Sequence, residues 1–192
     1  MKKIVGLLLF SFFIACTSKP EKKRIKEPID VVTGEWKEII SDDGRFKIQF
    51  PDYELRQGTN VFKDEWLGEI ENHFYRLNIQ DSINLNMTYD ITYSLRPDLK
   101  TDNDFEEMII NEKEHLISTF NGQINYEQVL KERDYPGREI LTKIDSSKVQ
   151  LTSRIYLNDG ILYRIMVLTD GGKGKLFNKS RSKFLDSFEI LE

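Results

Sequence analysis

The sequence predicts an α+β fold with a central antiparallel β-sheet and helices packed on it. Residues 83–95 alternate apolar and polar side chains without a break, which is the period of a strand with one buried face. Residues 105–120 change to a helical period, because their apolar side chains fall on one face of a helix. Asp159-Gly160 joins two apolar segments, and this dipeptide between strands is among the strongest signals of a β-hairpin.

Only strands are predicted before the helix. They are expected at 36–40, 46–50, 53–55, 60–62, 68–79 and 83–95. The last of these would extend roughly 43 Å at about 3.3 Å per residue, so we expect a bend, a bulge or a frayed end within it. Its polar face carries small and nearly uncharged side chains. Such a face suits either a helix or loop packed over it, or a shallow groove for a partner.

The helix at 105–120 is expected to have defined ends. Asn103 and Glu106 are spaced as a variant of the capping box, which predicts the start of the helix. Asn121-Gly122 predicts its end, because these residues readily adopt the left-handed conformation that closes helices.

A β-meander and a second helix are expected to complete the domain. The strands of the meander are predicted at 123–131, 138–145, 148–158 and 161–169. Residues 161–168 are apolar on both faces, which predicts a central strand covered on both sides. The closing helix is predicted over residues 177–188, where four apolar side chains share one stripe that docks on the sheet: Phe177, Phe184, Leu185 and Phe188.

The first residues, MKKIVGLLLFSFFIAC, predict a signal peptide. Two lysines precede an apolar segment at 4–15, which is too short for the roughly 20 residues that span a bilayer. The segment ends in Ala15-Cys16, and Cys16 is the single cysteine among 192 residues. This ending resembles the lipobox of bacterial lipoproteins, although Phe13 stands where leucine is usual. The alternative is an ordinary secretory signal followed by an incidental cysteine.

The lipobox resemblance implies three segments with different roles. Residues 1–15 are expected to be cleaved as a lipoprotein signal peptide, and Cys16 is expected to carry the lipid. Residues 16–33 are charged and lack apolar periodicity, so they are expected to form a disordered tether. Residues 34–192 are expected to fold as one domain. Thr17 is not the aspartate that usually retains lipoproteins at the inner membrane, so we expect the outer membrane, facing the periplasm.

The charge balance argues against nucleic acid as a partner. The formal net charge is −4, and removal of residues 1–15 takes away two lysines and no acidic residue, so the remaining chain is more acidic still. Phosphate backbones are bound by basic surfaces. The expected partners are therefore the membrane, through the lipid on Cys16, and an envelope protein.

Four segments resemble the PsbP-like superfamily: GRFKIQFP near the start of the domain, YPGREI (Tyr135 to Ile140), RIYLNDGILYRIMVL and the closing FLDSF. The resemblance spans roughly residues 34–192 and implies a PsbP-like α/β/α sandwich. It also implies the role of an accessory or assembly factor, because plant and cyanobacterial members support a photosystem. No metal-binding position of that family has a match here, so the resemblance implies no site residues.

The sequence carries few signs of catalysis. His73 and His115 are its two histidines, and neither lies in a cluster with the spacing of metal ligands or of a nucleophile and its base. A plain turn is the favoured interpretation of Asp42-Asp43, with a calcium site as the alternative. We therefore predict no catalytic residue, no metal and no cofactor. The alternative is an envelope hydrolase that gathers His73 or His115 with serine and aspartate.

One basic cluster near the closing helix is a candidate binding surface. It follows three glycines and could bind an anion or a partner through Lys173, Lys175, Lys179, Arg181 and Lys183. The alternative is a solvated turn. The function that the sequence favours is a membrane-anchored envelope lipoprotein whose domain is a non-catalytic binding or assembly module, with a purely structural envelope protein as a weaker option.

Overall fold

The structure is a computed structural model, and it describes residues 35–64, 67–79, 86–131, 134–144, 149–170 and 179–192. The elements in chain order are β1 (Trp36–Ser41), β2 (Phe46–Pro51), β3 (Arg56–Asp64), β4 (Gly68–Asn78), β5 (Asn86–Leu95), α1 (Asp102–Phe120), β6 (Gly122–Val129), β7 (Gly137–Ile144), β8 (Val149–Asn158), β9 (Ile161–Asp170), α2 (Lys179–Asp186) and β10 (Glu189–Ile190).

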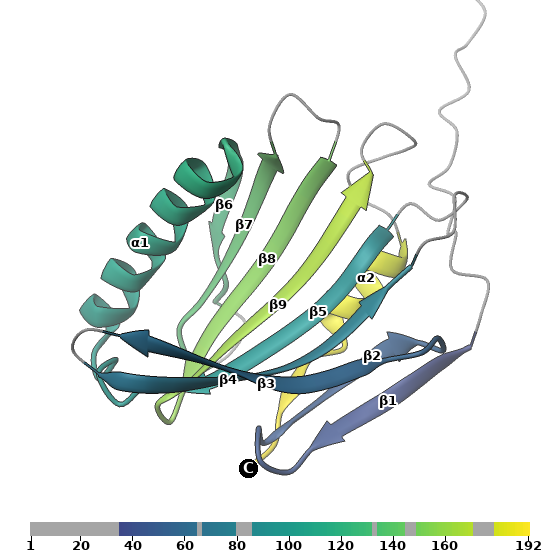
Figure 1. The fold of residues 1–192 in the computed structure, drawn as a ribbon, viewed down its shortest axis with the longest axis horizontal. Coiled ribbons are helices and arrows are strands. Elements are labelled where there is room, and N and C mark those ends of the chain that lie inside the picture. Colours follow the sequence, from purple (N-terminus) through teal and green to yellow (C-terminus); the bar gives the residue numbers. More distant parts are fainter. Residues whose placement is uncertain (1–34, 65–66, 80–85, 132–133, 145–148, 171–178) are drawn as a thin grey trace, which may run out of the picture.

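Two antiparallel sheets form the framework of the fold (Figure 1). The larger is a 7-stranded sheet in the order β3-β4-β5-β9-β8-β7-β6, and the smaller is a 3-stranded sheet in the order β1-β2-β10. The α+β fold with a central antiparallel sheet is therefore confirmed. The separate smaller sheet was not expected from the sequence, because β10 has only 2 residues and carries no periodic signal.

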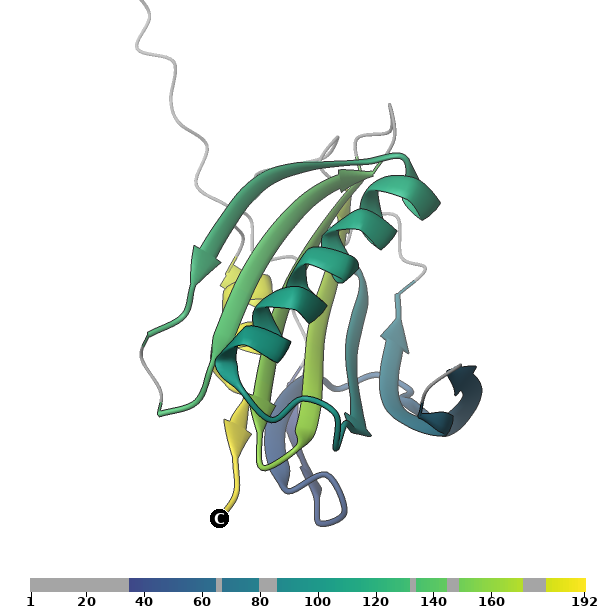
Figure 2. The same ribbon diagram turned by 90° about the vertical axis from the view of Figure 1, so that its left-hand side faces the viewer.

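The large sheet has a hydrophobic core on each face. Figures 1 and 2 show α1 lying across one face of the sheet, on the side of β6 and β7. The small sheet and α2 cover the opposite face. The core under α1 includes Phe105, Met108, Ile109, Ile140, Ile155 and Leu162. The core under the small sheet includes Phe46, Ile48, Phe50, Tyr89, Ile91, Tyr163, Ile165, Phe184 and Phe188.

The central strand β9 supplies side chains to both cores, as its two apolar faces predicted. Tyr163 and Ile165 face the small sheet, whereas Leu162 belongs to the core under α1. The turn from β8 to β9 is the predicted hairpin, because Asn158 pairs with Ile161. Its two central residues have left-handed backbone, with φ of 49° at Asp159 and 71° at Gly160. Both angles are positive, as in the type I′ turns that match the twist of paired strands.

Two predictions about the strands before α1 have different outcomes. The expected irregularity in the long strand is confirmed by a change of register between Asn86 and Thr88 where β5 pairs with β9. The short strand expected at 53–55 is wrong, whereas residues 60–62 lie in a strand that is longer than expected, β3. Residues 53–55 lie between β2 and β3 outside any strand, and the Tyr53 N–H donates to the Pro51 carbonyl over 2.8 Å. The whole of β3 is one strand because β4 gives it backbone partners along its full length.

The N-cap of α1 lies two residues earlier than expected, so the predicted Asn103–Glu106 capping box is wrong. Thr101 is the N-cap, and its hydroxyl accepts the Asp104 N–H over 3.2 Å. The Asp104 carboxylate accepts the Thr101 N–H over 2.8 Å, which completes the capping box. At the other end, Asn121 takes the left-handed conformation with φ of 48° and closes the helix.

The capping carboxylate of Asp104 should make stability depend on pH. Backbone N–H groups of Lys100 and Thr101 lower the pKa of Asp104 below its ordinary value of 3.8. A lowered pKa in the folded state stabilises the fold fully above the ordinary pKa, and this contribution is lost as pH falls through the folded pKa. We therefore expect Asp104→Asn to destabilise the protein near neutral pH and to lose that effect in acid.

Urea denaturation of the protein and its variant, at a series of pH values, measures this dependence. The matched control is Glu114→Gln, which removes one exposed charge from the same helix. A difference between the protein and Asp104→Asn that stays constant down to about pH 2 would contradict the charge-based explanation of the cap.

Candidate functional site

The connection between β5 and α1, residues 96–101, borders three cavities at one end of the domain. A cavity of about 350 Å³ lies beside α1, one of about 560 Å³ lies beside β4, and one of about 440 Å³ lies beside the β8–β9 turn. We name them the α1 cavity, the His73 cavity and the turn cavity. The Arg96 N–H donates to the Gly160 carbonyl over 2.7 Å, so the β8–β9 hairpin holds the connection in place. Pockets that meet on one segment make this end the best candidate for a binding site.

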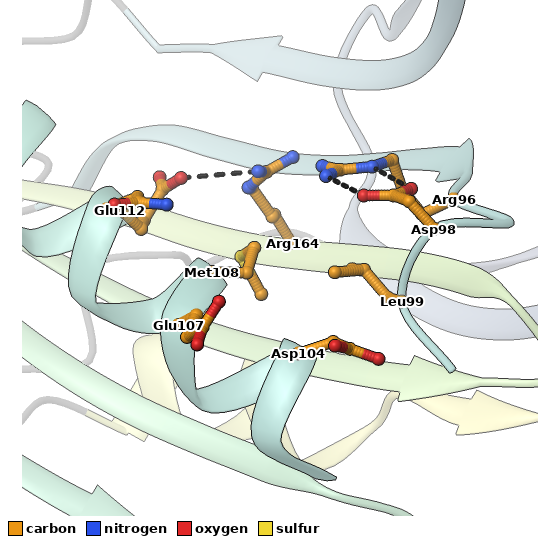
Figure 3. A pocket seen from close by; sticks show the side chains of 9 residues that line it. Arg96, Asp98, Leu99, Asp104, Glu107, Met108, Glu112 and Arg164 are labelled. Carbon is orange, nitrogen blue, oxygen red and sulfur yellow. Dashed lines mark hydrogen bonds and ion pairs between the residues drawn. The ribbon is translucent and has the colours of Figure 1, made fainter. Parts of the chain in front are cut away.

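The α1 cavity is lined mainly by charged side chains (Figure 3). Arg164 of β9 reaches Glu112 of α1, with 3.2 Å between guanidinium and carboxylate. Arg96 forms a bidentate ion pair with Asp98, in which two guanidinium nitrogens donate to the two carboxylate oxygens over 2.9 and 2.7 Å. The hydrogen bonds from Arg96 lower the pKa of Asp98. In Figure 3 the two guanidinium groups lie next to each other.

These ion pairs have a structural role as well as a chemical one. The pair between Arg164 and Glu112 ties α1 to the central strand of the sheet. Leu99 and Met108, which also line the cavity, belong to the core under α1. Among the described residues, the buried Nε of Arg164 has no hydrogen-bond partner. Both arginines of the cavity are already paired with carboxylates of the protein, Arg96 with Asp98 and Arg164 with Glu112.

The His73 cavity has a different character, because most of its wall is apolar. Its apolar side chains are Leu67, Ile70, Tyr93, Leu95, Pro97 and Ile161. Three carboxylates and one histidine complete it: Asp43, Glu69, Glu71 and His73. Leu95, at the end of β5, exposes 71% of its surface. An apolar pocket with a few polar groups around it is the usual form of a specific binding site.

His73 is positioned by three neighbours. Its Nδ1 lies 2.9 Å from the Thr59 hydroxyl on the adjacent strand β3, and its Nε2 lies 3.7 Å from the Glu71 carboxylate. Its ring stacks on Tyr93, with 4.9 Å between ring centres. His115 is elsewhere, in α1, where its Nδ1 lies 3.1 Å from the Thr119 hydroxyl. The two histidines therefore do not share a site.

The residues of the predicted basic cluster do not form one exposed group. Lys173 and Lys175 lie outside the described residues. Arg181 is 4% exposed, and it donates from a guanidinium nitrogen to the Thr152 hydroxyl over 3.1 Å, so it is not a surface group. Burial lowers the pKa of Arg181. Lys183 lies over the ring of Trp36, with 4.5 Å from its ammonium nitrogen to the ring centre, and Lys179 is exposed.

The polar face of β5 is buried rather than solvated. Asp90, Thr92 and Ser94 are all buried. The Arg76 side chain of β4 donates to Asp90 from Nε over 3.0 Å. Burial raises the pKa of Asp90, and the Arg76 guanidinium opposes that shift only in part. Asn84 lies outside the described residues. Side chains of the neighbouring strand thus contribute to covering this face, which neither sequence-based alternative included.

The other chemical predictions concern metals and membranes. Asp43 lines the His73 cavity and the Asp42 carbonyl accepts the Arg45 N–H over 3.2 Å, as in a plain turn. Across the described ranges, no group of three or more histidine, cysteine, aspartate and glutamate side chains could hold a metal ion. Within the same ranges, none of the helices has the length and apolar character needed to cross a membrane.

Comparisons with known proteins show the fold. No family model matches this sequence. No curated protein matches it. The solution structure of cyanobacterial PsbP (CyanoP) from Synechocystis sp. PCC 6803 is similar, with a TM-score of 0.51 and 10% identity over 82% of this chain and 93% of that chain. This likeness shows that the chain has a PsbP-like fold, and at such low identity it shows the fold alone.

Two further solved structures have lower similarity. The Ran-binding protein Mog1p of Saccharomyces cerevisiae has a TM-score of 0.48 and 9% identity, over 83% of this chain and 97% of that chain. A Pseudomonas aeruginosa protein of unknown function, PA94, described as a putative regulator, has a TM-score of 0.41 and 9% identity, over 73% of this chain and 86% of that chain. Neither likeness enters the functional argument.

Proposed function

We propose that the protein is an envelope lipoprotein, anchored through a lipid on Cys16, whose domain binds a partner without catalysing a reaction. The sequence supports the anchor, because a short apolar segment ends directly at the single cysteine. One structural observation carries the binding role: the β5–α1 connection borders three cavities at one end of the domain. In Figure 1, β1 runs toward the end of the large sheet at which the chain passes from β5 to α1. A tether attached before β1 would leave this end free to meet a partner.

A site-specific photo-cross-linking experiment tests the binding role. A benzophenone amino acid replaces Leu95 at the mouth of the His73 cavity, in cells that make the full chain. Val129, which is 44% exposed on the edge strand β6, is the matched control. We expect irradiation to give a defined cross-linked product from position 95 and none from position 129. Equal products from both positions, or no product from either, would contradict a binding site at this end.

A hydrolase is the second candidate, and one specific arrangement favours it. The His73 ring lies between two polar side chains. Its Nδ1 is 2.9 Å from the Thr59 hydroxyl, and its Nε2 is 3.7 Å from the Glu71 carboxylate. Nucleophilic catalysis uses a hydroxyl within reach of a base, and the base is oriented by a third group such as a carboxylate. All three side chains lie toward the surface of the β3–β4 hairpin, whereas hydrolytic sites need preorganised donors around the reacting carbonyl. Hydrolysis of p-nitrophenyl esters that disappears in His73→Ala would establish the hydrolase and overturn the non-catalytic proposal.

A further inference from the structure

We infer that the His73 cavity binds a protein segment that combines basic and apolar side chains. This inference rests on the proposed function, because it names the chemistry of the partner at the same end of the domain. Two independent properties of the cavity carry it. They are the apolar wall that β4, β5 and β9 build, and the excess of carboxylates among the lining residues.

The apolar wall is large and open to solvent. Tyr93 and Ile161 line it, and both are buried members of the core under the small sheet. Leu95 is the most exposed of the large apolar side chains that the structure describes, at 71%. A large apolar side chain left in water at a cavity mouth gains free energy when a ligand covers it. The ligand must therefore bring apolar surface of its own.

The carboxylates of the cavity favour a positively charged ligand. Asp43, Glu69 and Glu71 line it, and no lysine or arginine is among the described residues that line it. Lys63 lies opposite Glu69 in the pairing of β3 with β4, yet no ion pair joins these two side chains in the described structure. The one ion-pair-range contact of the Glu71 carboxylate in that structure is with the His73 ring, at 3.7 Å, and it adds a fixed cation to neither residue. Complementary charge favours association with a cation and discriminates against anionic partners.

These two requirements distinguish among possible occupants. Anionic lipid headgroups would meet three carboxylates, so the cavity repels rather than binds an anionic membrane surface. Free amines lack the apolar surface that would cover Leu95. A chain segment in which lysine or arginine alternates with a large apolar residue satisfies both the wall and the carboxylates. A volume of about 560 Å³ is also in the range that holds several side chains.

The test uses the full chain in a non-ionic detergent and three fluorescent five-residue probes. The probes are amidated Lys-Leu-Lys-Leu-Lys, Lys-Ser-Lys-Ser-Lys and Glu-Leu-Glu-Leu-Glu, and binding is followed by fluorescence anisotropy. We expect the first probe to bind at least about tenfold more tightly than either of the others, a difference of about 1.4 kcal/mol. We also expect its affinity to fall as salt is added. Equal binding of the serine probe or of the glutamate probe would overturn the inference.

Variants place the binding within the cavity. Glu69→Gln combined with Glu71→Gln should weaken the first probe about tenfold, because the double change removes two carboxylates while keeping their shape. Glu54→Gln combined with Glu114→Gln removes the same charge from exposed positions elsewhere and should change affinity less than about twofold. Leu95→Ser reports on the apolar wall and should also weaken the first probe. Circular dichroism confirms that each variant is folded. Unchanged affinity in the Glu69/Glu71 variant would overturn the inference.

The experiments distinguish a failure of the further inference from a failure of the proposed function. Cross-linking at position 95 together with no binding of the first probe means that a partner binds this end through other chemistry. In that case the further inference fails and the proposed function stands. Absence of a cross-link at position 95 contradicts the proposed function itself.

Discussion

Phe188→Ala should lower the free energy of unfolding by about 3–5 kcal/mol, because it removes a buried ring and leaves a cavity. Phe188 is 0% exposed and lies two residues beyond the end of α2. Its ring stacks on Tyr156 with 5.4 Å between centres, and it lies 5.9 Å from Phe46 of the small sheet and 5.4 Å from Tyr163 of β9. One ring thus joins the end of the chain to both sheets. A loss of this size is a large part of the stability of an ordinary domain.

Urea denaturation of residues 34–192, followed by circular dichroism, measures the change. Phe120→Ala is the matched control, because Phe120 is the same residue type and is 44% exposed at the end of α1. The control should cost far less than the Phe188 variant. A loss below about 1 kcal/mol for Phe188→Ala would show that the ring contributes little to the core.

Cys16→Ser should abolish membrane anchoring. Each buried methylene of a lipid chain contributes about 0.8 kcal/mol, so one chain binds reversibly and two or more hold a protein stably. If the thiol of Cys16 carries a diacylglyceryl group, the unaltered protein should partition into the detergent phase of a Triton X-114 extraction. The serine variant lacks the thiol and should appear in the aqueous phase or keep its uncleaved signal peptide.

Two substitutions of Thr17, the residue after Cys16, serve as controls for the anchor. Thr17→Ser keeps the cysteine and should leave the protein anchored. Thr17→Asp should also leave it anchored, but should shift it toward the inner membrane on density-gradient fractionation. A Cys16→Ser protein that has lost residues 1–15 and still partitions with detergent would exclude lipidation as the source of anchoring.

The elements with strong local signals could be predicted from the sequence, because their periods report burial directly. Asp159-Gly160 predicted the hairpin through its backbone conformation, and the apolar stripe predicted over 177–188 pointed to the burial of Phe184 and Phe188. The helix itself is shorter than predicted, because α2 ends at Asp186, and Phe177 lies outside the described residues. The start of α1 was misplaced because Thr101 and Asn103 are both good capping residues. Their competition is decided by the reciprocal bonds of Thr101 with Asp104.

The candidate site could not be predicted in the same way, because it is made by contacts between distant parts of the chain. Arg164 and Glu112 form a pair only because α1 packs across β9. The His73 cavity needs the β1–β2 turn, β4 and the end of β5 together. Charge alone was also misleading at Arg181, since a basic side chain in an acidic protein suggests a surface, yet Thr152 holds this one in the interior. Tertiary position, which no local pattern encodes, decided each case.

The order of strands in the large sheet has a consequence for how the chain folds. β3, β4 and β5 pair with their neighbours in sequence, and so do β6, β7, β8 and β9, so each half of the sheet can form through local contacts. The ladder between β5 and β9 alone joins the halves, and it closes a loop that contains α1 and three strands. Closing a long loop costs entropy before its contacts repay it, which slows folding. We expect the two halves to form early and their docking to limit the rate, with β5 and β9 as the last strands to gain their second neighbours.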